Sequence, residues 1–313
     1  MKVFYGLEHI EKIPNAVVTS GTFDGVHIGH QKILQRISET AKKDNGYSVL
    51  ITFWPHPRLV LDQNNSQLKL LSTIDEKIEL LRSFGLDYLV VIPFTKAFSK
   101  LSSFQFVNDI LVKTIGTKKL IIGYDHHFGR NREGSFEYLN ENAEKFGFTV
   151  EEISRQDIDD IGISSTKIRN SLLNHNISVA NDFLGRPYEI RGKVVHGDSR
   201  GKEMGFPTAN VEIKEDYKLI PCDSVYAVEV EFYGSEFYGM LNIGMRPTVD
   251  GKKKQMEVHI FDFNQEIYGE TLIVRFLDFI RIEKKFSDIQ ELKIQLDTDM
   301  KTVKERIKKI NKT

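Results

Sequence analysis

The stretch Ala16-Val-Val-Thr-Ser-Gly-Thr-Phe-Asp-Gly-Val-His-Ile-Gly-His30 decides the fold of the first half of the chain. Its first five residues form the apolar run of a buried strand, and helical periodicity follows over residues 30–43. A helix N-terminus carries unpaired N–H groups and partial positive charge, and glycines let the backbone approach a ligand closely. The turn is therefore suited to phosphate, to which His27 and His30 can donate hydrogen bonds. It is not a P-loop, because the Gly-Lys-Ser/Thr ending is missing.

Short apolar runs alternate with helical periodicity up to about residue 175. We expect strands at 16–20, 48–53, 88–93, 119–123 and 149–153, and helices at 30–43, 75–84, 104–115 and 135–146. Continuously apolar runs are typical of strands covered on both faces, which predicts an α/β fold with a parallel sheet between helices. Ligands bind such sheets beyond the carboxyl ends of the strands.

The pattern changes after Gly185-Arg-Pro187. Alternating runs at 188–195, 224–232, 236–242, 256–261 and 271–276 predict antiparallel strands, which we expect to form a small barrel closed by a helix from about residue 288. The stretch 174–186 is the expected boundary region. We therefore divide the chain into domains 1–183 and 184–313.

Composition excludes several classes of protein. The 313 residues carry a formal net charge of −1, so no basic field favours nucleic acid or an anionic membrane surface. Cys222 is the single cysteine, which excludes an internal disulfide framework and argues against a cysteine-based zinc site. We find no signal peptide and no apolar run of membrane-spanning length. We expect a soluble cytoplasmic protein; the sequence does not indicate its oligomeric state.

Three further motifs follow predicted strands or begin a helix in the first domain. They are Phe53-Trp-Pro-His-Pro57, the glycine-punctuated loop 123–134, and Ile163-Ser-Ser-Thr-Lys-Ile-Arg169. The last reads as a capped helix start, whose hydroxyls and cations also suit a triphosphate. The pair His27 and His30 permits metal binding by its spacing, but no carboxylate set completes a zinc site, so phosphate contact is favoured.

The second domain contains a long loop that ends in Phe206-Pro-Thr-Ala-Asn210. We expect this segment to form a fixed turn that holds the oxygens of Thr208 and Asn210 two residues apart. Such hard oxygens suit Mg²⁺, which takes a few protein ligands together with phosphate oxygens. Glycines 197, 201 and 205 let backbone N–H groups surround phosphates, although a plain hairpin connection collects the same residue types.

Taken together, these motifs resemble those of the bacterial bifunctional riboflavin kinase/FMN adenylyltransferase (FAD synthetase) family. The resemblance covers nearly the whole chain and includes Asn242-Ile-Gly, Glu257-x-His259, Tyr268-Gly269 and Arg281-x-Glu-x-x-Phe286. It implies a Rossmann-like nucleotidylyltransferase domain followed by a riboflavin kinase barrel. It also implies that ATP first phosphorylates riboflavin to FMN, and that a second ATP adenylylates FMN to FAD with release of pyrophosphate.

The resemblance implies the following roles. In the first domain, His27 and His30 act in catalysis, and the ATP contacts come from Gly21, Phe23, His27, His30, Ser165, Thr166 and Arg169. His56 and Asp125 are expected to bind flavin, near the FMN phosphate, with the adenosine as the alternative position. In the second domain, Glu257 is the general base, Thr208 and Asn210 hold Mg²⁺, Arg281 contacts flavin, and ATP is bound by Gly197, Gly201, Lys202 and Gly205. His126 stands where the family commonly has an aromatic residue, so its effect is open.

Two alternatives differ in class from a bifunctional enzyme. One is a monofunctional enzyme in which one module only binds flavin, and the other is a flavin-binding regulator. Intact Thr208, Asn210 and Glu257 argue against an inactive kinase, and His27 and His30 argue against an inactive adenylyltransferase. The near-neutral charge and the absence of a DNA-reading motif argue against a regulator.

Overall fold

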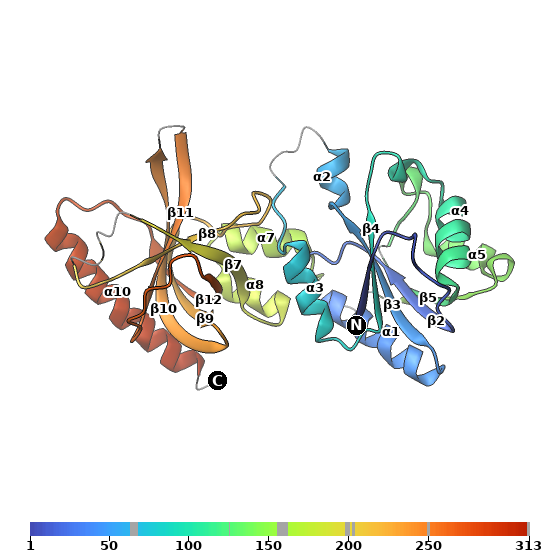
Figure 1. Cartoon of the computed structure of the whole chain (residues 1–313), viewed down its shortest axis with the longest axis horizontal. Helices are drawn as coiled ribbons and strands as arrows, with labels where there is room; N and C mark the ends of the chain where they lie inside the picture. Colours follow the sequence, from blue (N-terminus) through green and yellow to red (C-terminus); the bar gives the residue numbers. More distant parts are fainter. Residues whose placement is uncertain are drawn as a thin grey trace. The chain divides into compact units, whose positions relative to one another are not determined.

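The computed structural model describes residues 1–62, 68–124, 126–154, 162–197, 201, 204–248 and 251–311. Contacts between Cα atoms divide the chain into two compact units, Met1–Ser165 and Thr166–Thr313. The two domains expected from the sequence meet at residues 183 and 184, and that boundary stays a prediction. Figure 1 shows a sheet flanked by helices in the first unit and a barrel in the second.

The described residues of the first unit form a six-stranded parallel sheet in the order β1-β4-β3-β2-β5-β6. The strands are β1 (Lys2–Tyr5), β2 (Ala16–Ser20), β3 (Tyr47–Trp54), β4 (Tyr88–Pro93), β5 (Thr117–Gly123) and β6 (Thr149–Ile153). From β2 the chain moves to one side through β3 and β4, and β5 then lies on the other side. The order reverses at β2 and β5, which is where ligands bind in open sheets of this kind.

Successive strand residues point to opposite faces of this sheet, and each face has its own core. Val17, Leu50 and Leu89 pack with residues of α1 (Ile28–Lys43) and α3 (Ile74–Arg82). Val18 and Val49 pack on the other face, against η2 (Phe106–Ile115). The other helices of this unit are α2 (Pro57–Leu61), η1 (Phe98–Lys100), α4 (Ser103–Gln105), η3 (Arg130–Arg132) and α5 (Phe136–Phe146). Because helices cover both faces of the sheet, the strands are continuously apolar in sequence.

The second unit is a closed antiparallel barrel in the order β10-β11-β8-β7-β12-β9. Its strands are β7 (Tyr188–Val195), β8 (Ala209–Glu212), β9 (Ser224–Phe232), β10 (Ser235–Thr248), β11 (Gly251–Ile260) and β12 (Thr271–Ile282). Helices α7 (Ser165–Leu173) and α8 (Ile177–Leu184) precede the barrel, and α10 (Ile289–Ile310) follows it. Val303 and Ile307 of α10 pack into a barrel cluster with Phe206, Met240 and Phe261. The predicted fold class is confirmed.

Some local elements were missed or differ in type from those expected. The short strands β1 and β8 were not predicted, and the helix expected at 104–115 begins at Ser103 and continues as a π-helix. Helix α8 lies within the stretch 174–186, and the domain boundary expected there stays a prediction. The segment expected as a turn reaches into a strand, because Ala209 and Asn210 pair with β11. Pairing with strands distant in the sequence fixes β1 and β8, and a short local pattern does not contain that information.

Candidate functional site

The turn between β2 and α1 is held in an unusual backbone conformation. Phe23 (φ 47°), Gly25 (φ 79°) and Val26 (φ 40°) all adopt positive φ angles. Such angles are costly for residues other than glycine, so surrounding contacts must hold them. The Asp24 carboxylate accepts hydrogen bonds from the backbone N–H groups of Leu71 (3.0 Å) and Ser72 (3.2 Å), and the Gly25 N–H donates to the Ser72 hydroxyl (3.3 Å). The turn is therefore anchored by the segment that leads into α3.

The two predicted histidines lie together at the start of α1. His27 is the N-cap, and its Nδ1 accepts a hydrogen bond from the His30 backbone N–H at 3.4 Å. The two rings stack with their centroids 3.6 Å apart. The pKa of His30 lies well below its ordinary value, first because the ring is buried and then because of the charges of His27 and Lys77. His30 is therefore a neutral hydrogen-bonding group at neutral pH.

The His30 ring also has a polar atom that lacks a partner. Its Nδ1 is buried and forms no hydrogen bond with the described part of the chain. Buried polar atoms are nearly always paired, so this nitrogen is available to a hydrogen-bond partner from outside the chain, such as water or a ligand. The Phe23 ring lies 4.6 Å from the His30 ring and covers it on one side.

A cleft of about 850 Å³ opens at the carboxyl ends of the strands. Gly21 and His56 line it, whereas His27 and His30 do not. Its remaining lining includes the aromatic residues Phe53, Phe94, Phe98, Phe106 and Phe128 and the cations Arg58, Lys100, Arg130 and Arg132. Aromatic walls beside cations suit a flat ring system that carries an anionic group.

Two histidines of the cleft also hold local structure. His56 caps α2, since its Nδ1 accepts a hydrogen bond from the Arg58 backbone N–H at 3.2 Å. His126 Nε2 lies 3.2 Å from the hydroxyl of Ser20, the last residue of β2, and its ring stacks on Phe128. Burial lowers the pKa of His126 to about 4. Asp125, predicted to lie near the flavin, is outside the described residues.

The start of α7 is connected to the turn by one hydrogen bond. The Ser165 hydroxyl donates to the Asp24 carbonyl oxygen at 3.0 Å. Ser165 is the first residue of α7 and the last of the first unit, whereas Thr166 and Arg169 belong to the second unit. The predicted contacts of these three residues with a triphosphate stay predictions.

In the barrel, the predicted base and metal ligands lie on neighbouring strands. Glu257 of β11 pairs with Asn210 of β8 on one side and with Asn242 of β10 on the other. Directly opposed residues on paired strands bring their side chains close together. The Gln255 amide donates to the Asn210 side-chain oxygen. Thr208 immediately precedes β8 and lines the same cavity as Asn242 and Glu257.

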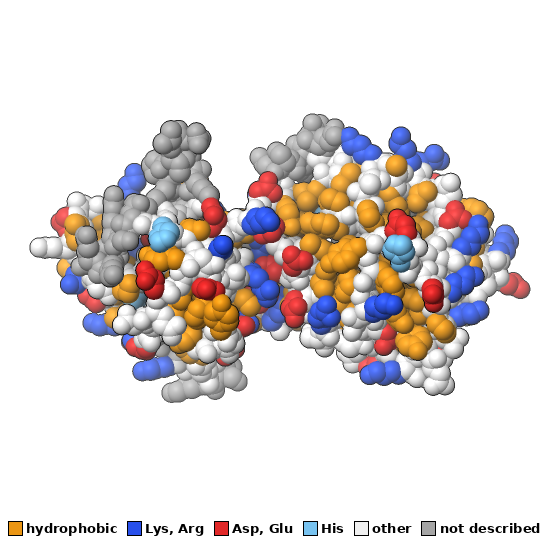
Figure 2. Space-filling view, in the orientation of Figure 1, with side chains coloured by type: hydrophobic (Ala, Val, Ile, Leu, Met, Phe, Trp, Pro, Cys, Tyr) orange, Lys and Arg blue, Asp and Glu red, His pale blue; other side chains and the backbone are white. Residues whose placement is uncertain are grey.

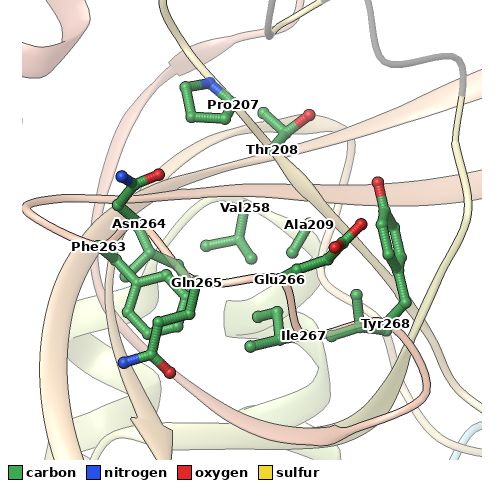
Figure 3. Close-up of a pocket in the computed structure, with 12 residues that line it drawn as sticks. Pro207, Thr208, Ala209, Val258, Phe263, Asn264, Gln265, Glu266, Ile267 and Tyr268 are labelled. Atoms are coloured by element: carbon green, nitrogen blue, oxygen red, sulfur yellow. The ribbon is translucent and has the colours of Figure 1, made fainter.

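Two cavities of the barrel share Thr208. One has a volume of about 770 Å³ and is lined by Glu257, Arg281 and α10 residues that include Leu292 and Leu296. The other, of about 350 Å³, is shown in Figure 3, where the apolar side chains of Val258, Ala209 and Ile267 lie centrally and Thr208 lies at the edge. Thr208 therefore borders both cavities.

The loop glycines approach the Thr208–Asn210 segment closely. A Cβ atom at Gly197 would overlap the Asn210 amide, and one at Gly201 would overlap the Phe206 carbonyl and lie 3.3 Å from the Thr208 hydroxyl. Gly205 has φ +85°, which also favours glycine. Gly197 and Gly201 therefore need glycine for close packing and Gly205 for its positive φ, whether or not they also contact phosphate. Lys202 is outside the described residues.

Two further charged residues lie at the larger cavity. The Arg281 guanidinium pairs with the buried Asp299 carboxylate of α10 at 2.7 Å, and it also lies over the Phe286 ring. Its predicted flavin contact stays a prediction. Burial, followed by the charge of Asp223, raises the pKa of the Glu283 carboxyl, while a hydrogen bond from Asn242 opposes this. The motifs quoted from the sequence contain Asn242 and Glu283, but sequence reasoning gave neither of them a role.

The barrel oxygens fit a magnesium ion that is shared with phosphate. Thr208 and Asn210 supply hard oxygen donors, and the glycine loop packs closely against both. Within the described ranges, no group of three or more His, Cys, Asp or Glu side chains is arranged to hold a metal ion. An ion at Thr208 and Asn210 would thus need oxygens from a substrate and water, as Mg²⁺ commonly does.

The surface offers no single-signed field on the face drawn in Figure 2, where acidic and basic side chains are interspersed over both units. No helix among the described residues is long and apolar enough to cross a membrane.

Comparisons with known proteins match both halves. The FAD synthetase family matches residues 9–167, and the riboflavin kinase family matches residues 184–307. The chain is 40% identical over 309 residues to the bifunctional riboflavin kinase/FMN adenylyltransferase of Buchnera aphidicola subsp. Schizaphis graminum, with 97% of this chain and 98% of that protein covered. It is 37% identical over 308 residues to the protein of the same name from Escherichia coli strain K12, with 97% of each covered.

A solved structure described as a macrolide-efflux protein from Streptococcus pneumoniae is also similar. It has a TM-score of 0.87 and 33% sequence identity, and the match covers 96% of this chain and 98% of that one. Both halves thus match by sequence, and they do so in the order that the motifs predict. The chain belongs to the bifunctional riboflavin kinase/FMN adenylyltransferase family.

Proposed function

We propose that the chain carries out two consecutive ATP-dependent reactions on a flavin and that each reaction has its own site. As a member of its family it phosphorylates riboflavin to FMN and adenylylates FMN to FAD. The assignment of sites rests on the observation that the two sets of candidate catalytic residues lie in different units of the chain. A stacked histidine pair lies at a strand–helix turn in one unit, and in the other unit Glu257 lies opposite Asn210 on a paired strand and lines the larger cavity.

Adenylyl transfer is assigned to the turn at β2 and α1. A phosphate oxygen of FMN bonds to the α-phosphorus of ATP, the bond from that phosphorus to the bridging oxygen of the β-phosphate breaks, and pyrophosphate leaves. The nucleophile is already an anion, so positioning and charge stabilisation suffice. His27 and His30 contact the ATP phosphates from the turn that holds Gly21 and Phe23. FMN occupies the aromatic cleft near His56.

Phosphorylation of riboflavin is assigned to the barrel. An alcohol nucleophile gains from a general base, and Glu257 takes the proton of the ribityl 5′-hydroxyl as its oxygen bonds to the γ-phosphorus and ADP leaves. Riboflavin occupies the larger cavity with Glu257, and ATP the smaller one, so that they meet at Thr208. When bound, Mg²⁺ held by Thr208 and Asn210 neutralises phosphate charge.

Single substitutions in the full chain test the two-site assignment. Each variant is incubated with riboflavin, ATP and Mg²⁺, and separately with FMN, ATP and Mg²⁺, and the flavins are separated. We expect His30→Ala to lower FAD formation from FMN by about 10²-fold and to leave FMN formation from riboflavin unchanged. Glu257→Gln should have the opposite effect, with about a 10²–10⁴-fold loss of phosphorylation. Loss of both activities in either variant contradicts separate sites.

The same assay distinguishes the alternatives. Formation of FAD from riboflavin by the unmodified chain supports two active modules, FMN alone indicates a kinase with a flavin-binding module, and unchanged riboflavin indicates a binding protein. The absence of nucleic-acid and membrane partners and a cytoplasmic location stay predictions from the sequence.

A further inference from the structure

Helix α3 carries a lysine on its buried face. Ile74, Lys77, Ile78 and Leu81 follow the spacing of an apolar stripe, and Lys77 is only 2% exposed. Lysine is almost never fully buried unless its charge is paired. An apolar side chain in the same stripe would avoid the cost of desolvating an ammonium group. The position therefore calls for an explanation beyond packing.

The ammonium group is directed to the β2–α1 turn. Lys77 Nζ donates to the Thr22 carbonyl oxygen at 2.6 Å, and the Thr52 hydroxyl donates to the same oxygen at 3.3 Å. Within the described part of the chain, Lys77 forms no salt bridge. The Asp24 carboxylate acts electrostatically on the ammonium group and accepts hydrogen bonds from the Leu71 and Ser72 N–H groups. Lys77 thus holds the turn through a carbonyl oxygen, and its ammonium charge is opposed by a carboxylate that does not pair with it directly.

The charge of Lys77 reaches the histidine pair. Burial lowers the pKa of Lys77 to about 8, against the opposing effect of Asp24, so the ammonium form prevails at neutral pH. The same charge contributes to the lowered pKa of His30, since a cation repels an imidazolium. The positive charge of Lys77 attracts an anion that lies against His30. The low-dielectric surroundings strengthen this attraction.

We propose that Lys77 is a positioning residue for adenylyl transfer that holds the Thr22 carbonyl and supplies a buried positive charge beneath the triphosphate-binding turn. The inference rests on the proposed assignment of that turn to ATP. Lys77 acts through the turn and its field, and not by contact with the reacting atoms. Its charge favours pyrophosphate, the most highly charged part of the reaction, more than it favours flavin.

The test replaces the lysine by an unbranched neutral residue of similar length. In Lys77→Met, we expect kcat for FMN adenylylation to fall about 10²-fold. In the reverse reaction of FAD with pyrophosphate, the KM for pyrophosphate should rise about tenfold, while the KM for FAD stays within about twofold. Riboflavin phosphorylation by the same chain should not change. Lys77→Arg, which keeps the charge, should restore the KM for pyrophosphate to within about threefold.

A second buried lysine provides the matched control. Lys218 is 3% exposed, donates from Nζ to the Glu189 carbonyl at 2.9 Å and lies over the Tyr188 ring, all within the barrel unit. Lys218→Met removes a comparable buried ammonium, and we expect adenylylation to stay unchanged. Folding of the first unit is followed by the fluorescence of Trp54, the single tryptophan, which lies at the end of β3.

The outcomes separate the inference from the assignment of the site. The inference is overturned if Lys77→Met keeps both kcat for adenylylation and KM for pyrophosphate within threefold of the values of the unmodified chain. It is also overturned if the KM values for pyrophosphate and FAD rise equally. If Lys77→Met does not fold, an Lys77→Arg variant that folds and still has a tenfold higher KM for pyrophosphate overturns it instead. Retained adenylylation in His30→Ala refutes the site assignment itself.

Discussion

Asp24 gives the sharpest test of how the β2–α1 turn is held. Its carboxylate is 2% exposed and accepts hydrogen bonds from the N–H groups of Leu71 and Ser72. In Asp24→Ala, both N–H groups lose this acceptor. A hydrogen bond to a charged group contributes about 1.5–3 kcal/mol, so we expect the free energy of unfolding of the first unit to fall by about 3–6 kcal/mol. For a unit of this size the unfolding midpoint should drop by roughly 6–24 °C.

The assay uses the position of the single tryptophan. Trp54 packs against the core that contains Val17 and Leu50, so the thermal change in its fluorescence reports unfolding of the first unit. Riboflavin phosphorylation reports the barrel in the same sample. We expect Asp24→Ala to lower FMN adenylylation at temperatures where the first unit is still folded, because Phe23 and Val26 lose the contacts that hold their positive φ angles.

The control is Asp109→Ala, which removes an exposed carboxylate that pairs with Lys113. We expect its midpoint to match that of the unmodified chain, because exposed ion pairs contribute little. A shift of less than about 2 °C in Asp24→Ala would refute the anchoring role, and so would an equal loss of phosphorylation.

Two further predictions concern charge. The pKa of His126 is about 4 in the folded chain against 6.5 ordinarily, so only the unfolded state gains this proton between those values. The free energy of unfolding should therefore fall as the pH drops from about 6.5 to about 4. In His126→Phe, the unfolding midpoint followed by Trp54 fluorescence should depend less on pH in this window. An unchanged pH dependence contradicts the prediction. Arg281→Met leaves the buried Asp299 carboxylate without its cation, and we expect the barrel unit to lose about 3–5 kcal/mol of stability, seen as heat inactivation of the kinase at lower temperature. Arg306→Met, at an exposed pair with Asp278, should not change inactivation.

Local patterns in the sequence predicted most of the architecture. The bounds predicted for β2, β4, β6, β7 and β9 agree with the structure, because apolar runs and glycine turns are local signals. The strand β1 was missed because it has four residues and pairs only with β4. The start of α1 was placed two residues late, because His27 caps the helix where a serine, threonine or aspartate is more usual.

The candidate sites were predicted less completely. Motif spacing indicated His27, His30, Thr208, Asn210 and Glu257, whose proposed roles stay untested, but it gave no role to Lys77. A lysine in the apolar stripe of a predicted helix was the available signal, since Ile74, Ile78 and Leu81 surround it at helical spacing. The direction of its ammonium group depends on a turn more than fifty residues away in the chain. A short stretch of sequence cannot show that Lys77 lies against Thr22.

The sequence by itself determined the two-part organisation, the strand–helix turn and the motifs that indicate the family. These depend on periodicity, glycine and residue type, which act over a few neighbouring residues. Only the tertiary structure decided that Glu257 faces Asn210 across two strands. It also decided that the turn is held by Lys77 of α3 and by Asp24, whose carboxylate accepts hydrogen bonds from the segment before α3. Strand register and helix packing bring these groups together, and both arise from burying apolar surface contributed by distant parts of the chain.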